Sequence, residues 1–243
     1  MKQTTVIITG HSHGLGAALA AAWLKHGARV IGLARRNNPE LAATYPGQLQ
    51  ETAIDLADPQ VVLDYSRSDA FRHTCQTAET LWLFNNAGTV APSAPLGTQP
   101  DDAITHAVNL NITTPLILAN AVLAHARDRD NVRIVHISSG AARKPYPGWS
   151  IYGASKAALD RHAADAAAEG VRITSLAPGV VDTAMQAGMR ADPAFPLRAQ
   201  FAALHADGKL QSAAATAAKI LAYCLSDQFA REPVTDIRTF DIS

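Results

Sequence analysis

The chain has 243 residues, of which 48% are hydrophobic and 17% charged, enough apolar material for one large domain spanning 1–243. Lysine and arginine together number 21, as do aspartate and glutamate, so no net charge favours nucleic acid or an anionic membrane as a partner. We identify no signal peptide and no apolar segment of bilayer length, and we therefore expect a cytoplasmic protein that acts on a small molecule.

Strand-like and helix-like segments alternate along the chain. Apolar runs rich in β-branched residues predict strands at 6–9, 30–34, 49–54, 81–84, 132–137, 171–176 and 237–240. Helical spacing of apolar residues predicts helices at 15–24, 40–44, 101–126, 150–169 and 212–225, whereas 184–208 is the least regular stretch. This alternation indicates an α/β fold: a single Rossmann-type, doubly wound parallel sheet flanked by helices on both faces. Ligands bind such sheets beyond the carboxyl ends of the strands.

A glycine-rich loop joins the first predicted strand to the first predicted helix. Residues 9–16 read T-G-H-S-H-G-L-G, with the spacing G-x-x-x-G-x-G. Glycines let the backbone turn sharply and approach a pyrophosphate at the helix N-terminus, although a tight turn alone also uses glycine. Because the loop lies between strand and helix, we predict that it binds a dinucleotide. The binding residues are predicted to be Gly10, Ser12, His13, Gly14, Leu15 and Gly16.

Two arginines follow the second predicted strand, at the point where sites that prefer NAD usually carry a carboxylate. Arg35 can meet a ribose 2′-phosphate in bidentate geometry, with His13 on the same side of the glycine loop, whereas Arg36 is also explained as a solvated loop residue. The predicted cofactor is therefore NADPH, and NADH is less favoured. Asp55, followed by Leu56, comes after the third predicted strand and either binds the adenine amino group or caps the next helix.

Three polar residues suggest proton chemistry near the fifth strand. Ser139 follows that strand, and Tyr152 and Lys156 are spaced i, i+4 at the start of the next helix, which puts their side chains on one helical face. An ammonium near the phenol favours the phenolate and lowers a tyrosine pKa that is about 10 when unperturbed. The tyrosine can then exchange a proton with a substrate oxygen that Ser139 holds. A surface cation beside a half-buried ring is the alternative for the Tyr–Lys pair alone.

Together these segments resemble the short-chain dehydrogenase/reductase family, and the resemblance covers essentially the whole chain. The family motifs are T-G-x-x-x-G-x-G at 9–16, N-N-A-G at 85–88, a serine at 139 followed by Y-x-x-x-K at 152–156, and P-G-x-x-x-T at 178–183. The resemblance implies an NAD(P)(H)-dependent oxidoreductase that acts on CH–OH groups.

The resemblance also implies roles for single residues. Asn109 corresponds to the family's catalytic asparagine, which binds a water behind the lysine, and Asn111 is the competing assignment. Lys156 would also bond the nicotinamide ribose. Other residues implied to lie at the cofactor are Asn86, Ala87, Gly88, Pro178, Gly179, Val181 and Thr183. Family habit further predicts a homodimer or homotetramer.

Residues 144–152 resemble the stretch before the catalytic tyrosine in sepiapterin reductases and bacterial benzil reductases of this family. We therefore predict NADPH-dependent reduction of an aromatic or hydrophobic ketone or dicarbonyl, with Tyr152 as the general acid. Trp149 and Met185 are predicted to join Ser139 and Tyr152 in binding the carbonyl substrate. Residues 184–208 are predicted to form a mobile lid over the nicotinamide, with simple packing of a loop on the domain as the alternative.

Two other functions share much of this pattern. An NAD-dependent alcohol dehydrogenase that works oxidatively would use the same residues, and a non-enzymatic nucleotide-sensing regulator would keep the fold without needing the serine, tyrosine and lysine. The nine histidines show no zinc-ligand pattern, so no metal is predicted. Cys75 and Cys224 are expected to be buried, inert thiols.

Overall fold

The structure is a computed structural model that describes residues 3–241, and its centre is a seven-stranded parallel sheet. The strand order is β3-β2-β1-β4-β5-β6-β9, in which the chain reverses its direction of growth between β1 and β4. The strands are β1 (Thr4–Thr9), β2 (Arg29–Ala34), β3 (Leu49–Ala53), β4 (Thr80–Asn85), β5 (Val132–Ile137), β6 (Ile173–Ala177) and β9 (Val234–Asp236). A second, two-stranded sheet pairs β7 (Val181–Asp182) with β8 (Gln211–Ser212).

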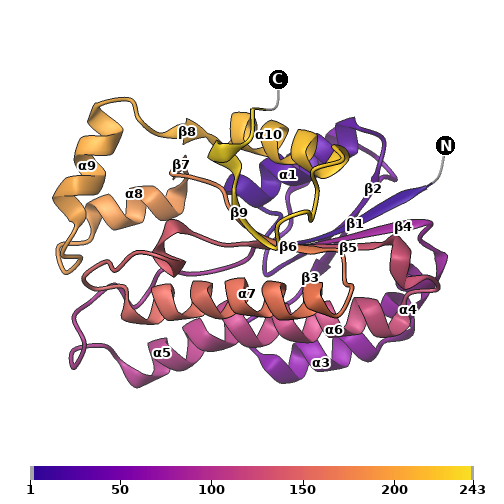
Figure 1. Ribbon diagram of the computed structural model, residues 1–243, viewed down its shortest axis with the longest axis horizontal. Helices are drawn as coiled ribbons and strands as arrows, with labels where there is room; N and C mark the ends of the chain where they lie inside the picture. Colours follow the sequence, from indigo (N-terminus) through magenta and orange to yellow (C-terminus); the bar gives the residue numbers. More distant parts are fainter. Residues whose placement is uncertain (1–2, 242–243) are drawn as a thin grey trace.

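Helices cover both faces of the large sheet (Figure 1). One face carries α1 (Gly14–Lys25) and α10 (Ala213–Leu225), and the short α2 (Pro39–Thr44) follows β2. The other face carries α3 (Pro59–Arg67), α4 (Asp69–Thr77), α6 (Thr114–His125) and α7 (Ser150–Ala168). A π-helical turn, Asn109–Thr113, connects α5 (Asp101–Val108) to α6. The predicted doubly wound α/β fold is therefore confirmed.

The core divides between the two faces because successive strand residues point in opposite directions. On β1, Val6 and Ile8 pack under α1 and α10, whereas Ile7 packs toward α3 and α6. The two cysteines follow this division: Cys75 lies in one core and Cys224 in the other, both buried as free thiols. Burial raises the pKa of Cys75 to about 12 and raises that of Cys224, so both stay protonated and unreactive, as expected.

Three expectations about single elements were wrong. The last strand is Val234–Asp236, and the predicted strand at 237–240 is a 3-10 turn, because the Asp236 side chain accepts a hydrogen bond from the Arg238 backbone and turns the chain. Helices α3 and α4 were not predicted, although Asp58 and Ser68 cap their N-termini. The stretch 184–208 is not irregular, since it contains α8 (Ala184–Ala191) and α9 (Arg198–Ala206).

The continuous helical run Asp101–His125 agrees with the helix predicted at 101–126, but it is more apolar than expected. By length and composition it could cross a membrane, contrary to the expectation that no segment of this kind exists. In the structure this run lies against the sheet, and Leu118, Ala119 and Val122 are part of the core under β4 and β5. Its apolar composition is what a helix buried against a parallel sheet requires.

Candidate active site

A cleft of about 470 Å³ opens beyond the carboxyl ends of the strands, and helices α8 and α9 contribute to its lining. This is the position at which doubly wound sheets bind their ligands. With the exception of Asn109, every residue predicted from the sequence to bind the cofactor or the substrate or to act in catalysis lines this cleft. Residues from seven separate segments, spread from Gly10 to Met185, are thus brought together.

The glycine loop forms one wall of the cleft, and its backbone turns too tightly to admit a side chain at Gly16. Gly10 has a φ of +72°, and a Cβ on Gly16 would lie 2.1 Å from the Gly10 carbonyl oxygen. Asn86, after β4, fixes the loop because its Nδ2 donates to the Thr9 carbonyl at 2.9 Å. The Thr9 hydroxyl in turn accepts the backbone N–H groups of Asn86 and Ala87. Such a cradle at the start of α1 fits the pyrophosphate of a dinucleotide.

The loop histidines point in different directions. His13 precedes α1 and lines the cleft, whereas His11 is fully buried and its Nε2 lies 2.7 Å from Glu51 Oε1. The same Glu51 oxygen accepts the Asn38 backbone N–H at 2.6 Å. Glu51 therefore ties the glycine loop to the chain that follows β2, and His11 takes no place in the cleft.

The adenosine end of the cleft is positively charged. Arg35 and Arg36 are both exposed there, and among residues 3–241 neither has an acidic partner within 4 Å. Asp55 lies in the same wall, where its Oδ1 accepts the Ala57 backbone N–H at 3.0 Å and closes a local turn. Two unpaired guanidinium groups and no carboxylate directly after β2 fit a phosphorylated ribose.

Helix α7 presents Tyr152 and Lys156 on one face, with the Lys156 Nζ 5.7 Å from the centre of the Tyr152 ring. Burial lowers the pKa of Lys156 to about 8, against Asp160, which raises it. Nζ donates to the Ile137 carbonyl at 2.8 Å. At neutral pH the lysine is therefore mostly an ammonium, in a site from which water is largely excluded.

The expected lowering of the tyrosine pKa was wrong. Burial raises the pKa of Tyr152 above its usual value, and a hydrogen bond with Ser139 only partly offsets that rise. The reason is that a nearby ammonium does not compensate for taking a phenolate out of water. The phenol is consequently protonated at neutral pH, and it can act as a donor toward an oxygen atom bound beside Ser139.

The structure brings Asn111, and not Asn109, to the lysine. A Cβ placed on Gly88 would lie 3.1 Å from Asn111 Oδ1 and 3.5 Å from Lys156 Nζ, so the two groups face the same narrow space. Asn111 is fully buried; its Oδ1 accepts from the Thr89 N–H, and its Nδ2 donates to the Thr89 carbonyl. The π-helical turn changes which residue of 109–113 points inward, and normal helical spacing does not anticipate this turn.

Aromatic side chains build the substrate end. Trp149 stacks on Phe195 of the segment between α8 and α9, with ring centres 5.1 Å apart, and contacts Tyr152 edge-on at the same distance. Phe201 of α9 packs against both Trp149 and Phe195. Met185 is 42% exposed and lines the opening. The wall is therefore apolar and aromatic on the side that adjoins the phenol.

Some cleft residues lie outside every sequence motif. They share no local pattern, because each comes from a different part of the chain and reaches the cleft only through the fold; they are Val90, His106, Leu110 and Arg238. Within the described part of the chain, no group of three or more histidine, cysteine, aspartate or glutamate side chains has a geometry that could hold a metal ion.

The fold and the cleft define an α/β nucleotide-binding protein with a serine, a tyrosine and a lysine at the position of the reacting group. A family model for the short chain dehydrogenases matches residues 4–194. The chain therefore belongs to the short-chain dehydrogenase/reductase family and is an NAD(P)-dependent oxidoreductase.

Relatives with named activities and a solved structure agree with this assignment. A benzil reductase ((S)-benzoin forming) of Bacillus cereus is 35% identical over 219 residues, covering 85% of this chain and 88% of the relative. A sepiapterin reductase of Meriones unguiculatus is 32% identical over 240 residues, covering 92% of each. The crystal structure of a short-chain dehydrogenase/reductase from Burkholderia vietnamiensis is 36% identical, with a TM-score of 0.71, and covers 98% of this chain and 100% of that one.

Proposed function

We propose that this oxidoreductase uses NADPH to reduce an aromatic or hydrophobic ketone, most favourably a vicinal diketone, to an alcohol. The observation that carries the proposal is the position of the Tyr152 phenol, which lines the cleft together with Ser139 and Lys156, is faced by Trp149 and is protonated at neutral pH. A protonated phenol is the form that a carbonyl reductase requires, because the reduced oxygen must gain a proton.

The residues available to hold the cofactor follow from the geometry of the cleft. The glycine loop and the start of α1 would receive the pyrophosphate, Arg35 the 2′-phosphate, and Val181 with Thr183 the nicotinamide end. Bound there, NADPH supplies the hydride that is added to the carbonyl carbon.

The protein's own groups handle the carbonyl oxygen. Ser139 donates a hydrogen bond that orients this oxygen, and Tyr152 transfers its hydroxyl proton to the same atom as negative charge develops on it. The Lys156 ammonium stabilises the phenolate that remains, since both groups lie on one face of α7. Asn111 holds Thr89 and, through its Nδ2, the Ser155 hydroxyl, and thereby keeps the surroundings of the lysine fixed.

The aromatic wall supports the choice of substrate. Trp149, Tyr146 and Phe201 offer ring faces and edges to a flat apolar compound, and Met185 and Met189 adapt to its outline. The name of the Bacillus cereus relative points to the same class, an aromatic diketone.

The test is a reduction assay with purified protein, NADPH and three classes of carbonyl compound: benzil, a quinone and a pterin. We expect benzil to be reduced fastest, with Tyr152→Phe lowering kcat by roughly 100-fold or more while the affinity for NADPH changes less than about two-fold. Tyr146→Phe is the matched control, since this tyrosine lines the same cleft but lies outside α7. Turnover of Tyr152→Phe near that of the unmodified protein would exclude the phenol as the acid.

The same assay separates reduction from the oxidative alternative. With NADH in place of NADPH we expect a clearly lower kcat/KM, because Arg35 then lacks its phosphate partner. A protein that oxidised benzoin with NAD faster than it reduced benzil with NADPH would instead be an NAD-dependent alcohol dehydrogenase.

A further inference from the structure

A carboxylate lies one turn beyond Lys156 on the same face of α7. Asp160 is spaced i+8 from Tyr152, and its side chain is only 12% exposed. Asp160 Oδ1 accepts the hydroxyls of Ser138 at 2.6 Å and of Ser175 at 2.7 Å, and Oδ2 lies 3.4 Å from Arg143 Nε. Three donors from three other segments thus converge on one side chain that has no place in the sequence motifs.

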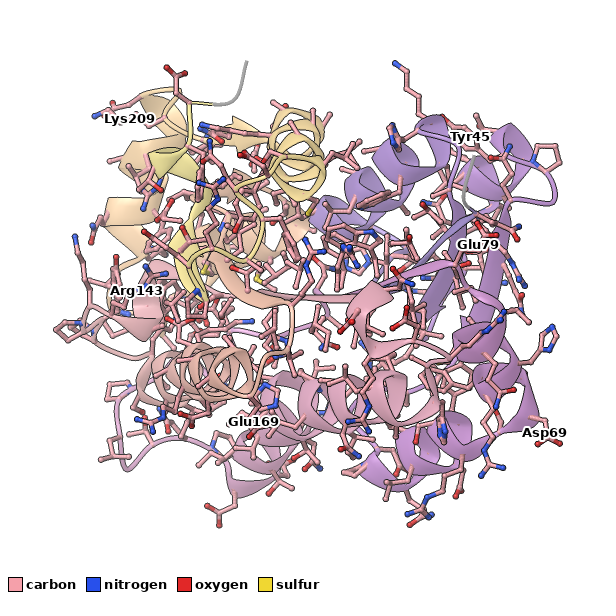
Figure 2. All side chains as sticks on the ribbon, turned by 45° about the vertical axis from the view of Figure 1, so that its right-hand side comes forward. Tyr45, Asp69, Glu79, Arg143, Glu169 and Lys209 are labelled. Atoms are coloured by element: carbon pink, nitrogen blue, oxygen red, sulfur yellow. The ribbon has the colours of Figure 1, made fainter. Side chains whose placement is uncertain are left out.

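These donors surround the strand end that carries Ser139. Ser138 is the residue immediately before Ser139, and Ser175 lies on the neighbouring strand β6. Arg143 follows the turn that begins after Ser139, and its Nη2 also donates to the Thr235 carbonyl on β9 at 3.3 Å. Figure 2 shows Arg143 toward the same side of the molecule as Lys209, away from Tyr45 and Glu79. Asp160 therefore links α7, β5, β6 and, through Arg143, β9 around the serine.

The charges near the lysine make Asp160 distinctive. His136 on β5 is uncharged, since burial lowers its pKa to about 3, and His162 on α7 also has a lowered pKa because of burial. Asp236 on β9 is paired with Arg238 at 2.6 Å. Asp160 is the carboxylate that raises the pKa of Lys156 against the effect of burial.

Within the described part of the chain, the other elements packed against α7 carry no further buried, unpaired carboxylate. The π-helical turn and β6 contribute uncharged residues, Asp101 and Asp102 of α5 are exposed, and His106 of α5 lines the cleft. Ser138 and Ser175 are both nearly inaccessible to solvent, so their hydroxyls depend on Asp160 for a hydrogen-bond acceptor.

We propose that Asp160 is a positioning residue for the reduction: it fixes the strand end that presents Ser139 to the phenol, and its negative charge keeps the neighbouring Lys156 an ammonium through the neutral pH range. The proposal rests on the proposed function, in which Tyr152 is the acid and Lys156 stabilises the phenolate. If Asp160 only held the surrounding segments together, replacing it would affect stability and kcat, but not the pH at which activity is lost.

The decisive variant is Asp160→Asn, which keeps the shape and one acceptor oxygen but removes the charge. With benzil and NADPH we expect kcat to fall about 10-fold and the basic limb of the kcat/KM profile to move to lower pH by about one pH unit. The KM for NADPH should change less than about two-fold. Asp165→Asn is the matched control, because Asp165 is an exposed carboxylate on the same helix that is paired only with Arg161, and its profile should be unchanged.

Two further variants separate charge from position. Asp160→Glu keeps the charge, so its basic limb should stay at the original pH even where kcat is reduced. Ser138→Ala removes one hydrogen bond and leaves the carboxylate, so it should lower kcat a few-fold without moving the limb. If Asp160→Asn does not fold, Asp160→Ser takes its place as the uncharged variant: a basic limb that stays at the original pH in it overturns the role of the charge, and a limb at lower pH supports it.

A readout without turnover keeps this test distinct from the test of the proposed function. The NMR chemical shift of the Lys156 side chain, assigned by its absence in Lys156→Met, reports the loss of the ammonium proton. We expect this loss at lower pH in Asp160→Asn than in the unmodified protein, because the carboxylate charge that favours the ammonium is gone. Identical titrations and pH profiles in Asp160→Asn and the unmodified protein would overturn the role of Asp160, whereas an active Tyr152→Phe would overturn the function itself.

Discussion

The two ends of the active-site cleft owe their shapes to different parts of the protein, the backbone at one end and side chains at the other. At the phosphate end the shape comes chiefly from the backbone: the loop turns through glycines at 10, 14 and 16, and the side-chain amide of Asn86 holds it in place. At the substrate end the shape comes from side chains, chiefly Trp149 and Phe201, carried by segments far apart in the sequence. Substitutions should therefore affect cofactor binding through sterics at one end and substrate binding through packing at the other.

The largest effect should come from filling the backbone cradle. In Gly16→Ala the new methyl group meets the Gly10 carbonyl at 2.1 Å, and backbone cannot move aside as a flexible side chain can. We expect NADPH affinity to fall roughly 100-fold, measured by fluorescence titration. Gly188→Ala on α8 is the control, because a Cβ there meets nothing within 4 Å. Unimpaired binding by Gly16→Ala would show that the cradle does not receive the phosphates.

A charge reversal at the adenosine end should be the next largest. Arg35→Asp places a carboxylate where sites that prefer NAD have one, and we expect the NADPH-to-NADH ratio of kcat/KM to fall about 30-fold. Arg36→Asp, one residue further along, should lower the ratio far less if only Arg35 meets the 2′-phosphate. Equal effects from the two variants would indicate a general field and not a specific contact.

A smaller change is expected when the aromatic wall is altered. Phe195→Leu removes the ring that stacks on Trp149 while keeping an apolar side chain, and we expect the KM for benzil to rise about 5-fold with NADPH binding unchanged. Phe71→Leu is the matched control, since Phe71 is equally buried but lies on α4, in the core on the α3 and α6 side of the sheet. If Phe195→Leu lost stability as the control does but kept its KM for benzil, the Phe195 ring would contribute to stability and not to substrate binding.

The smallest effect near neutral pH should be that of pH on the reduction. The pKa of Lys156 is lowered to about 8 and that of Tyr152 is raised, so the active form combines an ammonium with a neutral phenol. The value of kcat/KM should be steady below pH 8 and fall as pH rises through about 8, where the lysine loses its charge. Binding of NADPH should depend on pH much less than kcat/KM does, because the arginine expected to meet the 2′-phosphate does not titrate there. A rate that rose through pH 8 would contradict the assignment of an acid.

The contrast between the two ends also explains what the sequence could predict. The glycine loop and the Tyr152–Lys156 pair depend on spacing within one segment, and the structure brings them together in the cleft. The position of Asn111 depends on a π-helical turn, which no spacing of apolar residues signals. The tyrosine pKa was misjudged because proximity can be read from a sequence, whereas the extent of burial depends on distant elements.

The sequence does contain a signal for Asp160, although no motif includes this residue. Extending the i, i+4 rule by one more turn from Lys156 reaches Asp160, and the serine before Ser139 must point to the other side of its strand. By contrast, Arg238 and His106 reach the cleft from segments with no recognisable pattern. The positions of these two residues are set by the packing of whole helices and strands and not by their neighbours in the sequence.

The indole of Trp149 touches the Phe195 ring on one side and the Tyr152 ring on another. A ligand large enough to displace Phe195 would therefore also change the packing that orients the phenol. Discrimination among ketones by size can accordingly appear in turnover as well as in binding: a bulky compound can dwell in the cleft and still be reduced slowly, with no clash at the reacting carbon.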